Sequence, residues 1–496
     1  MGSPKAEVLR TVTSNRWRAI RVVFGNAFLV VGAASVLLLA GSSDTGAAHA
    51  SYGGGHAVAV RAGSPLTVTA PVNGSNLDYF GVGQNFAAPG VIAALWDLRG
   101  GTIRYPGGAI SNYWDWQNGS VNQPAITTGT GKIKPGRVQN YGFTLRTLLG
   151  IVRETGDTPV FDLNLLSSTL PVQLQMLHTA QSLGIPVRYV ELGNEFYLNF
   201  STYLKAFPTA SSYARTVAKW APAIRAAFPN AEIAAVGSLP QDTARERSWN
   251  HTLLSVAGAE INAVTLHDYS GPIVNDPSAA QVLAAAQTNW RSTQPVMAAI
   301  PSRYRIWFTE FNLDRQGCLG GDPARGTTWL HGLYVAELTA LFDQSPRVQL
   351  NDYWDLFSPD LATGAFSSGP VPRSTVAGTA LMFLTNASAQ ASRVTPLRFT
   401  GAPSLPDGAT GVIGVSFNGP RGTRTVLMNL TDQSVNLSVG TGTGLSLGAS
   451  TVSVSAAPTT TVSGLTRTTG VLGRSVTLPA YTITGVGFTV PTAPGT

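Results

Sequence analysis

The chain has 496 residues, which exceeds one ordinary domain and suits a large barrel with a smaller appendage. Hydrophobic residues make up 44% of it and charged residues only 12%, while 53 glycines and 31 prolines supply many turns. This composition excludes a disordered chain, a coiled coil and a helical bundle. The single cysteine, Cys318, excludes a disulfide framework and a cysteine-based zinc site.

The formal net charge of +7 arises partly in an N-terminal segment with the pattern of a processing signal. Basic residues precede an apolar run at residues 28–40, and Ala48-His49-Ala50 fits a cleavage site. We expect residues 1–50 to be a signal peptide, or an N-terminal membrane anchor if they are not cleaved. Without them the net charge falls to about +4, and no nucleic-acid-binding signature is present. The expected location is therefore secreted or cell-surface, with no nucleic acid as partner.

Short apolar runs alternate with amphipathic helical patterns between residues 77 and 392. Eight such alternations predict an α/β fold, a (β/α)8 TIM barrel, with a linker and a possible sandwich strand before it at residues 51–76. The expected strands are residues 80–86, 101–105, 159–165, 187–195, 232–237, 261–268, 305–310 and 348–357.

The pattern changes near residue 393, where helical periodicity disappears and Thr, Ser, Val and Gly dominate. Alternating runs separated by turn residues predict a C-terminal antiparallel β-sandwich domain at residues 393–496. Residues 66–70 show similar alternation, so we expect them to pair with this domain.

Glutamate is scarce, with nine in the chain, so the position of each is informative. Glu195 ends the fourth expected strand and Glu310 ends the seventh. Active sites of such barrels lie at the C-terminal ends of the strands, and these two strands lie on opposite sides of the ring. Two facing carboxyl groups are what glycoside hydrolysis requires, one as acid and the other as nucleophile or base. A surface or structural salt bridge is the alternative role for either glutamate.

Several motifs resemble the clan of retaining glycosidases with a (β/α)8 barrel. The barrel-plus-sandwich layout is similar to the heparanase and β-glucuronidase family and to the α-L-arabinofuranosidase family. Ile103-Arg104-Tyr105-Pro106-Gly107-Gly108 resembles the second-strand motif of the arabinofuranosidases, and Leu266-His267-Asp268-Tyr269 resembles the sixth-strand segment of both families. The following Ser270-Gly271-Pro272 lacks the aromatic residues of heparanases, so a glucuronide pocket is not matched residue by residue.

The resemblance implies two catalytic carboxyl groups and their immediate partners. Glu195 would be the acid/base and Glu310 the nucleophile of a double displacement that retains the anomeric configuration. Asn194 would hydrogen-bond the sugar 2-hydroxyl. Tyr269 would donate to Glu310, and Arg104 would help to keep that carboxylate ionised.

Further substrate contacts are expected from His267, Trp354 and Trp114, the two tryptophans offering flat apolar faces to sugar rings. Purely structural roles stay open for these residues. Arg104 could pair a barrel carboxylate, His267 could be a satisfied core histidine, and either tryptophan could pack in the core.

The sequence thus predicts a secreted retaining glycoside hydrolase whose partner is an oligo- or polysaccharide, containing β-glucuronide or arabinofuranoside units. Six histidines without paired-ligand spacing give no reason to expect a metal or another cofactor. The alternative is a non-catalytic glycan-binding protein, favoured if the glutamates point away from the cleft or are locked in ion pairs. A polysaccharide lyase is a weaker third interpretation. A short carboxyl separation would favour the hydrolase.

Overall fold

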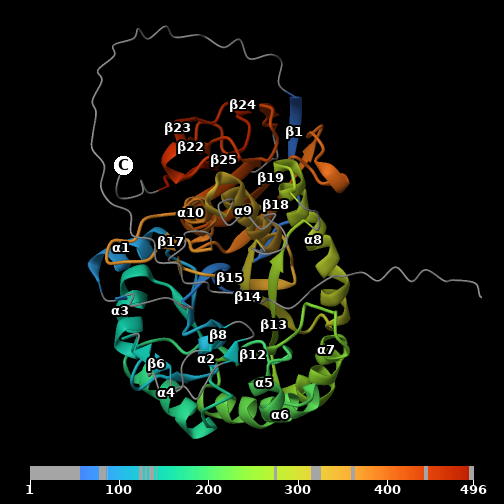
Figure 1. The fold of residues 1–496 in the computed structure, drawn as a ribbon. Helices are drawn as coiled ribbons and strands as arrows, with labels where there is room; N and C mark the ends of the chain where they lie inside the picture. The colour runs from blue at the N-terminus through green and yellow to red at the C-terminus, as the bar shows by residue number, and fades with distance from the viewer. Residues whose placement is uncertain are drawn as a thin grey trace, which may run out of the picture.

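The computed structural model describes residues 56–77, 85–86, 88–121, 127–128, 131–132, 139–140, 142–272, 276–313, 326–358, 363–440 and 445–490. The predicted leader at residues 1–50 lies outside this part of the chain, as do residues 80–84 of the first expected strand. Within it, no helix combines the length and apolar character that crossing a membrane requires. Figure 1 shows a barrel ringed by helices, with a β-rich domain at one side of it.

Eight parallel strands close into a barrel, which confirms the predicted fold class. Consecutive strands pair in chain order, and the last pairs with the first. The strands are β3 (Asn73–Asn76), β4 (Thr102–Tyr105), β10 (Thr158–Asp162), β11 (Tyr189–Leu192), β12 (Glu232–Val236), β13 (Ala263–Ser270), β14 (Arg305–Leu313) and β15 (Val348–Tyr353).

The first barrel strand is the one that differs from expectation, since β3 precedes both the expected strand at 80–86 and the predicted barrel start at 77. Its sequence, Asn-Gly-Ser-Asn, is polar, so hydrophobic periodicity gives no sign of it. The strand forms because β15 and β4 pair with its two edges and its side chains find buried partners. Asn73 donates to Asp343 at 2.9 Å, and Asn76 donates to the carbonyl of Thr309 at 3.0 Å.

Helices connect the strands and cover the outside of the barrel (Figure 1). Thr144, Thr209, Thr243, Ser278 and Thr375 cap helix N-termini by accepting a backbone N–H, which satisfies groups that would otherwise lack a partner. The helices are α1 (Pro89–Asp97), α2 (Gly108–Ser111), α3 (Leu145–Thr155), α4 (Leu170–Ser182), α5 (Ser201–Ala206), α6 (Ala210–Ala227), α7 (Ala244–Ala257), α8 (Ala279–Ala299), α9 (Trp329–Asp343) and α10 (Val376–Ser388), with 3-10 turns η1 (Gly258–Glu260), η3 (Pro406–Gly408) and η4 (Val462–Gly464).

Short strands decorate the loops around the barrel. One small sheet joins β5 (Trp114–Asp115), β6 (Ser120–Val121) and β9 (Gln139–Asn140), and two further pairs are β7 (Thr127–Thr128) with β8 (Gly131–Lys132) and β16 (Phe357–Ser358) with β17 (Phe366–Ser367).

The barrel interior is layered, because side chains on a strand alternate between inside and outside. One inner layer is apolar and includes Val160, Tyr189 and Trp307, which form a core cluster of their own. Two residues further along the same strands, Asp162, Glu191 and Thr309 are buried and polar. The alternation therefore places a polar layer directly above an apolar one, toward the C-terminal ends of the strands.

The second domain is built on a ten-stranded sheet, in which the start of the described chain also takes part. Of the residues 66–70 that we expected to pair with this domain, Leu66 and Thr67 form β2 and pair with β18, whereas Ala70 packs in the barrel core. The domain is mixed and not purely antiparallel, because β1 pairs in parallel with β21. The chain passes through the whole barrel between β1 and β21. No hairpin joins these two strands, so they are free to pair in parallel. The strands are β1 (His56–Ala62), β2 (Leu66–Thr67), β18 (Arg393–Thr400), β19 (Val412–Gly419), β20 (Gly422–Asn429), β21 (Val435–Ser438), β22 (Ser450–Ser455), β23 (Thr466–Val471), β24 (Ser475–Leu478) and β25 (Thr482–Val486).

The two domains are joined through α9 and α10, which lie between the barrel and strands β19, β20 and β25. Both helices are buried nearly all round, as their continuous apolar sequences require. Trp329 is fully buried and donates its indole N–H to the carbonyl of Tyr481 at 2.7 Å. This packing holds the β-rich domain against the barrel.

Candidate active site

Glu195 follows the end of β11 in a tight turn whose geometry depends on Gly193. That glycine has φ +89°, and a Cβ there would lie 2.3 Å from the ring of Phe196. Glu195 itself has φ +51°, a left-handed conformation that costs a non-glycine residue about 1–3 kcal/mol. Strain of this kind persists where the surrounding structure imposes it, and it is concentrated at functional sites. The turn places the Glu195 side chain at the barrel mouth, 19% exposed.

Glu310 lies within β14, opposite His267 of β13, where the register between the two strands shifts. Such an irregularity changes the direction of a side chain relative to a regular ladder. The Glu310 side chain is 6% exposed. Its Oε1 lies 2.7 Å from Nη1 of Arg104, and its Oε2 accepts the hydroxyl of Tyr269 at 2.6 Å. Two donors, one of them cationic, thus hold this carboxylate in place.

Arg104 on β4 is the hub of the polar layer and is completely buried. Besides Glu310, it pairs through Nε with Glu191 at 2.6 Å and through Nη2 with Asp162 at 2.8 Å. The same Nη2 donates to Oδ1 of Asn194 at 2.8 Å. Arg104 therefore does both things that the sequence left open, because it pairs the barrel carboxylates and also contacts the expected nucleophile.

The charges around Arg104 do not cancel one for one, since three carboxyl groups face one guanidinium. Burial raises the pKa of Asp162 well above its usual range, and neighbouring Glu191 adds to that shift while Arg104 opposes it. The direction of this shift favours the neutral form of Asp162 and so reduces the excess of negative charge around the single cation.

His267 links the two glutamates at the mouth. Its Nδ1 lies 2.9 Å from Oε1 of Glu195 and 3.5 Å from Oε2 of Glu310. Burial disfavours the imidazolium, but the two carboxylates outweigh burial and raise the pKa of His267 above its ordinary value. In the opposite sense, burial disfavours the charged form of Glu195, yet hydrogen bonding and charge from His267 lower its pKa. Tyr197 also donates to Glu195, at 3.2 Å.

The separation of the two glutamates is short, with one carboxylate oxygen of each and a ring nitrogen of His267 all within 4.8 Å of one another. By spacing alone these three atoms suit a metal ion. The guanidinium of Arg104 beside Glu310 opposes a second cation, and the Glu195 oxygen and His267 already share a hydrogen bond. We therefore assign the group to acid–base chemistry and assign no metal to it.

Asn194 is held firmly but keeps one group available. Its backbone N–H donates to Oδ1 of Asn112, and its own carbonyl accepts from Nδ2 of Asn112 at 2.9 Å. Its Oδ1 is occupied by Arg104, whereas its Nδ2 is buried and has no hydrogen-bond partner among the described residues. A fixed, unsatisfied amide donor beside Glu195 is a group that a ligand hydroxyl can satisfy.

The two tryptophans differ in their positions. Trp354 follows β15, is partly exposed and meets the ring of Tyr269 edge-on at 5.7 Å between centroids, so it borders the Glu310 side of the site. Trp114 is 4% exposed and donates its indole N–H to the hydroxyl of Tyr105 at 3.2 Å. Of the eight residues that the sequence selected, seven belong to the cluster or border it. Trp114 instead packs in the core against Tyr105.

No family model matches the sequence, and no curated protein sequence matches it. Solved structures do. An α-L-arabinofuranosidase from Thermotoga maritima is similar over 87% of this chain and 99% of its own, with a TM-score of 0.67 and 15% identity. A 4-O-α-L-rhamnosyl-β-D-glucuronidase from Fusarium oxysporum gives 0.60 and 16% over the same shares, and the endoglucanase Cel44A from Clostridium thermocellum gives 0.56 and 12%. The chain has the fold of these glycoside hydrolases.

The sequence interpretation did not select several residues of the cluster, namely Asp162, Glu191, Thr309 and Asn112. The first three follow from strand alternation, since each lies two residues beyond an inward apolar residue of the same strand. That signal requires strand ends known to one residue, which the sequence pattern does not provide. Asn112 lies beyond β4 and meets Asn194 only through the fold, 82 residues apart in sequence.

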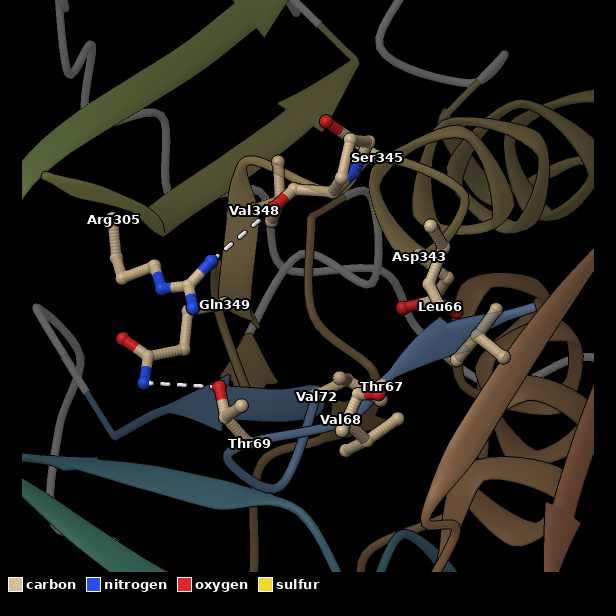
Figure 2. A pocket seen from close by; sticks show the side chains of 12 residues that line it. Leu66, Thr67, Val68, Thr69, Val72, Arg305, Asp343, Ser345, Val348 and Gln349 are labelled. Atoms are coloured by element: carbon tan, nitrogen blue, oxygen red, sulfur yellow. Dashed lines mark hydrogen bonds between the residues drawn. The ribbon is translucent and has the colours of Figure 1, made fainter. Parts of the chain in front are cut away.

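A small cavity of about 30 Å³ lies at the opposite, N-terminal end of the barrel, between the starts of β14 and β15 and the segment that enters β3. Figure 2 shows its lining, in which Gln349 donates to Thr69 at 3.3 Å and Arg305 faces the turn before β15. The cavity has room for about one water molecule. Its size and its distance from the glutamates exclude it as a sugar site.

Proposed function

We propose that the protein is a retaining glycoside hydrolase in which Glu310 is the nucleophile and Glu195 the acid/base. The observation that carries this proposal is the spacing of the two carboxylates, within 4.8 Å between one oxygen of each. Retaining enzymes place their carboxyl groups about 5–5.5 Å apart, whereas inverting enzymes need about 6.5–9.5 Å to admit a water molecule. The position of both at the C-terminal barrel mouth adds support.

Each residue of the cluster then has a chemical task. In the first step Glu310 attacks the anomeric carbon, the glycosidic C–O bond breaks, and Glu195 gives its proton to the departing oxygen. In the second step Glu195 takes a proton from water, the resulting hydroxide oxygen bonds to the anomeric carbon, and Glu310 leaves as a carboxylate. Arg104 and Tyr269 support the charge of Glu310 before and after the covalent intermediate. Asn194 offers its free Nδ2 to the sugar 2-hydroxyl.

A general acid must hold a proton, and we assign that proton in the free protein to the pair formed by Glu195 and His267. The lowered pKa of Glu195 and the raised pKa of His267 both favour the imidazole as its site. The 2.9 Å contact between Nδ1 and Oε1 allows it to move to Glu195 when the negative charge on the leaving oxygen develops.

Ion pairing of the glutamates was the sign that would favour a glycan-binding protein, and Glu310 is indeed paired with Arg104. The pairing also fits catalysis, because a nucleophile must be ionised and oriented. Carboxyl separation discriminates more sharply than pairing, since a purely structural role does not require the two groups to approach each other. The binding protein nevertheless remains the outcome to which absence of turnover would point.

For the substrate, we propose a glycan that contains α-L-arabinofuranoside or β-glucuronide units. The similar structures include an arabinofuranosidase and a rhamnosyl-glucuronidase. The motif around Arg104 resembles that of the arabinofuranosidases. We also propose that residues 1–50 direct export. N-terminal sequencing of protein recovered from culture medium would support cleavage near residue 50, whereas an intact N-terminus on washed membranes would indicate an anchor.

The deciding experiment is hydrolysis of a panel of aryl glycosides that includes both sugars, with NMR used to follow the anomeric proton of the first product. We expect retention. Glu310→Gln should lose more than about 10⁴-fold in kcat, the scale on which loss of a covalent nucleophile acts. Glu260→Gln, which removes a surface carboxylate paired with Arg225, is the matched control and should retain full activity.

Glu195→Ala tests the acid/base role separately. It should lose about 10²–10⁴-fold on substrates with poor leaving groups and much less on a dinitrophenyl glycoside, and azide should partly restore its turnover. Full activity of Glu310→Gln, or a first product of inverted configuration, would contradict the assignment of Glu310 as the nucleophile of a retaining enzyme.

A further inference from the structure

We propose that Thr309 and Glu191 are positioning residues that fix the protonated nitrogen of His267 and so keep one proton on the Glu195–His267 pair. The inference rests on the proposed hydrolase function and concerns the supply of the catalytic proton. Neither residue reaches the barrel mouth, because both side chains are completely buried beneath it.

A continuous line of hydrogen bonds runs from the mouth into the barrel. His267 faces Glu195 through Nδ1 and faces Oγ1 of Thr309 through Nε2, at 3.2 Å. The Thr309 hydroxyl donates in turn to Oε1 of Glu191 at 3.0 Å. The other oxygen of Glu191 pairs with Nε of Arg104, whose Nη1 contacts Glu310. The chain therefore connects the expected acid/base to the expected nucleophile through the polar layer.

The donors and acceptors along this line leave one consistent arrangement. A carboxylate paired with a guanidinium accepts hydrogen bonds and donates none, so Thr309 must use its hydrogen toward Glu191. The lone pairs of Thr309 are then what faces His267, and Nε2 must carry a hydrogen to be satisfied. Nδ1 is left as the atom that exchanges a proton with Glu195. The buried half of the site thus selects the tautomer that acid–base catalysis needs.

This arrangement also resists loss of the shared proton. If the pair lost it while Nε2 kept its hydrogen, the Nδ1 lone pair would face the Glu195 carboxylate. If the remaining hydrogen moved to Nδ1, the Nε2 lone pair would face the Thr309 oxygen. Either way two acceptors would oppose each other in a buried place, which is unfavourable. Thr309 therefore keeps the pair protonated to higher pH than it would otherwise be.

Other groups around His267 act in the same cluster and must be counted with it. Glu195 after β11 and Glu310 on β14 favour the imidazolium, while Arg104 on β4 opposes it. Tyr269, next but one to His267 on β13, donates to Glu310 and does not compete for the ring nitrogens. The contribution of Thr309 differs from these in kind, because the hydroxyl carries no charge and acts only through the direction of its hydrogen bond.

The test compares Thr309→Val, which keeps the shape and removes the hydroxyl, with Thr309→Ser, which keeps the hydroxyl. The first readout is the nitrogen-15 NMR spectrum of histidine-labelled full-length protein, with no substrate present. Six histidines are in the chain, and the signal of His267 is assigned by its loss in His267→Asn. We expect a protonated Nε2 in the wild type and in Thr309→Ser across the neutral range. Thr309→Val should shift the population toward the Nδ1-protonated ring and titrate at lower pH.

The second readout is the pH dependence of kcat/KM on an aryl glycoside with a poor leaving group. We expect the alkaline limb to move to lower pH by about one unit in Thr309→Val and to stay in place in Thr309→Ser, since one hydrogen bond is lost or kept. A dinitrophenyl glycoside, whose departure needs no acid, should show no such shift.

The two readouts separate the possible failures. A neutral His267 with its hydrogen on Nδ1 in the wild type would overturn the inference even if every glycoside is hydrolysed as proposed. Expected spectra without turnover of any glycoside would leave the tautomer assignment standing and contradict the hydrolase. If Thr309→Val fails to fold, Thr309→Ala is the second variant, and the wild-type spectrum alone still decides. Equal behaviour of Thr309→Val and Thr309→Ser would also overturn the proposal.

Discussion

Arg104 lies completely buried with its Nη1 2.7 Å from Oε1 of Glu310. The residue that balances the charges inside the barrel is therefore the same residue that orients the expected nucleophile. Stability and chemistry share this guanidinium, and lysine cannot reproduce its planar set of donors, which reaches three carboxyl groups at once. The predictions below separate the two contributions.

Replacement of Arg104 should affect folding before it affects chemistry. Arg104→Met leaves Glu191 and Glu310 buried without a cation, which should lower the free energy of unfolding by about 3–5 kcal/mol. Arg225→Met removes a half-exposed pair with Glu260 and should change it by no more than about 1 kcal/mol. Urea unfolding of both variants measures the difference. Equal losses would show that the buried pairs contribute no more than the surface pair.

Tyr269→Phe should reduce kcat. The phenyl ring keeps the edge contact with Trp354, while the 2.6 Å hydrogen bond to Glu310 is lost. A hydrogen bond to a charged group is worth about 1.5–3 kcal/mol, so we expect a decrease of about 10- to 100-fold in kcat. Tyr304→Phe, which removes a buried hydroxyl at the other end of the barrel, is the control. An unchanged kcat in Tyr269→Phe would exclude the supporting role.

The contribution of Asn194 to kcat/KM should depend on the presence of the sugar 2-hydroxyl. Wild-type protein should lose about 10- to 100-fold in kcat/KM on a 2-deoxy glycoside, and Asn194→Ala should lose about as much on the normal glycoside. Combining both changes should add little, because both remove the same hydrogen bond. Asn436→Ala, in the β-rich domain, should leave the 2-deoxy effect intact. Fully additive losses would contradict the contact.

Asp352 should make stability depend on pH in an unusual direction. Burial raises its pKa from 3.8 to about 8, although Thr102 donates to it at 2.6 Å. A folded-state pKa above the unfolded one contributes stability that is complete below about pH 4 and is lost as the pH rises toward 8.

Asp352→Asn removes this titration. Relative to wild type, its unfolding free energy should therefore improve between pH 5 and pH 8, by at least the roughly 1.4 kcal/mol of one pKa unit. Asp407→Asn on the surface serves as the control, and urea unfolding at the two pH values is the measurement. A parallel pH dependence in wild type and Asp352→Asn would show that Asp352 is already ionised when buried.

Local pattern was sufficient for the barrel because most of its strands are buried on both faces, and such strands appear as apolar runs that end where polar residues begin. Residues 232–237 and 305–310 were found in this way. The strand at Asn73–Asn76 was missed since its stability comes from partners such as Asp343, 270 residues away. No window of sequence contains that information.

The same contrast applies to the site. Scarcity made Glu195 and Glu310 conspicuous, and the topology of a closed barrel brought them to its C-terminal side. The predicted strand ends were wrong in detail, because β14 continues to Leu313 and β11 ends at Leu192, three residues before Glu195. Trp114 shows the limit, since whether an aromatic residue faces solvent or the core depends on what packs against it, here Tyr105.

By itself the sequence determined the barrel, the two glutamates and the asparagine that precedes the first of them, because strand periodicity and chain order are local or topological properties. Only the tertiary structure decided that one buried arginine contacts three acids and that His267 lies between the two glutamates. It also decided that Thr309 contacts His267 and donates to Glu191. Those relationships depend on distances of about 3 Å between side chains from different strands, which arise only when the barrel closes.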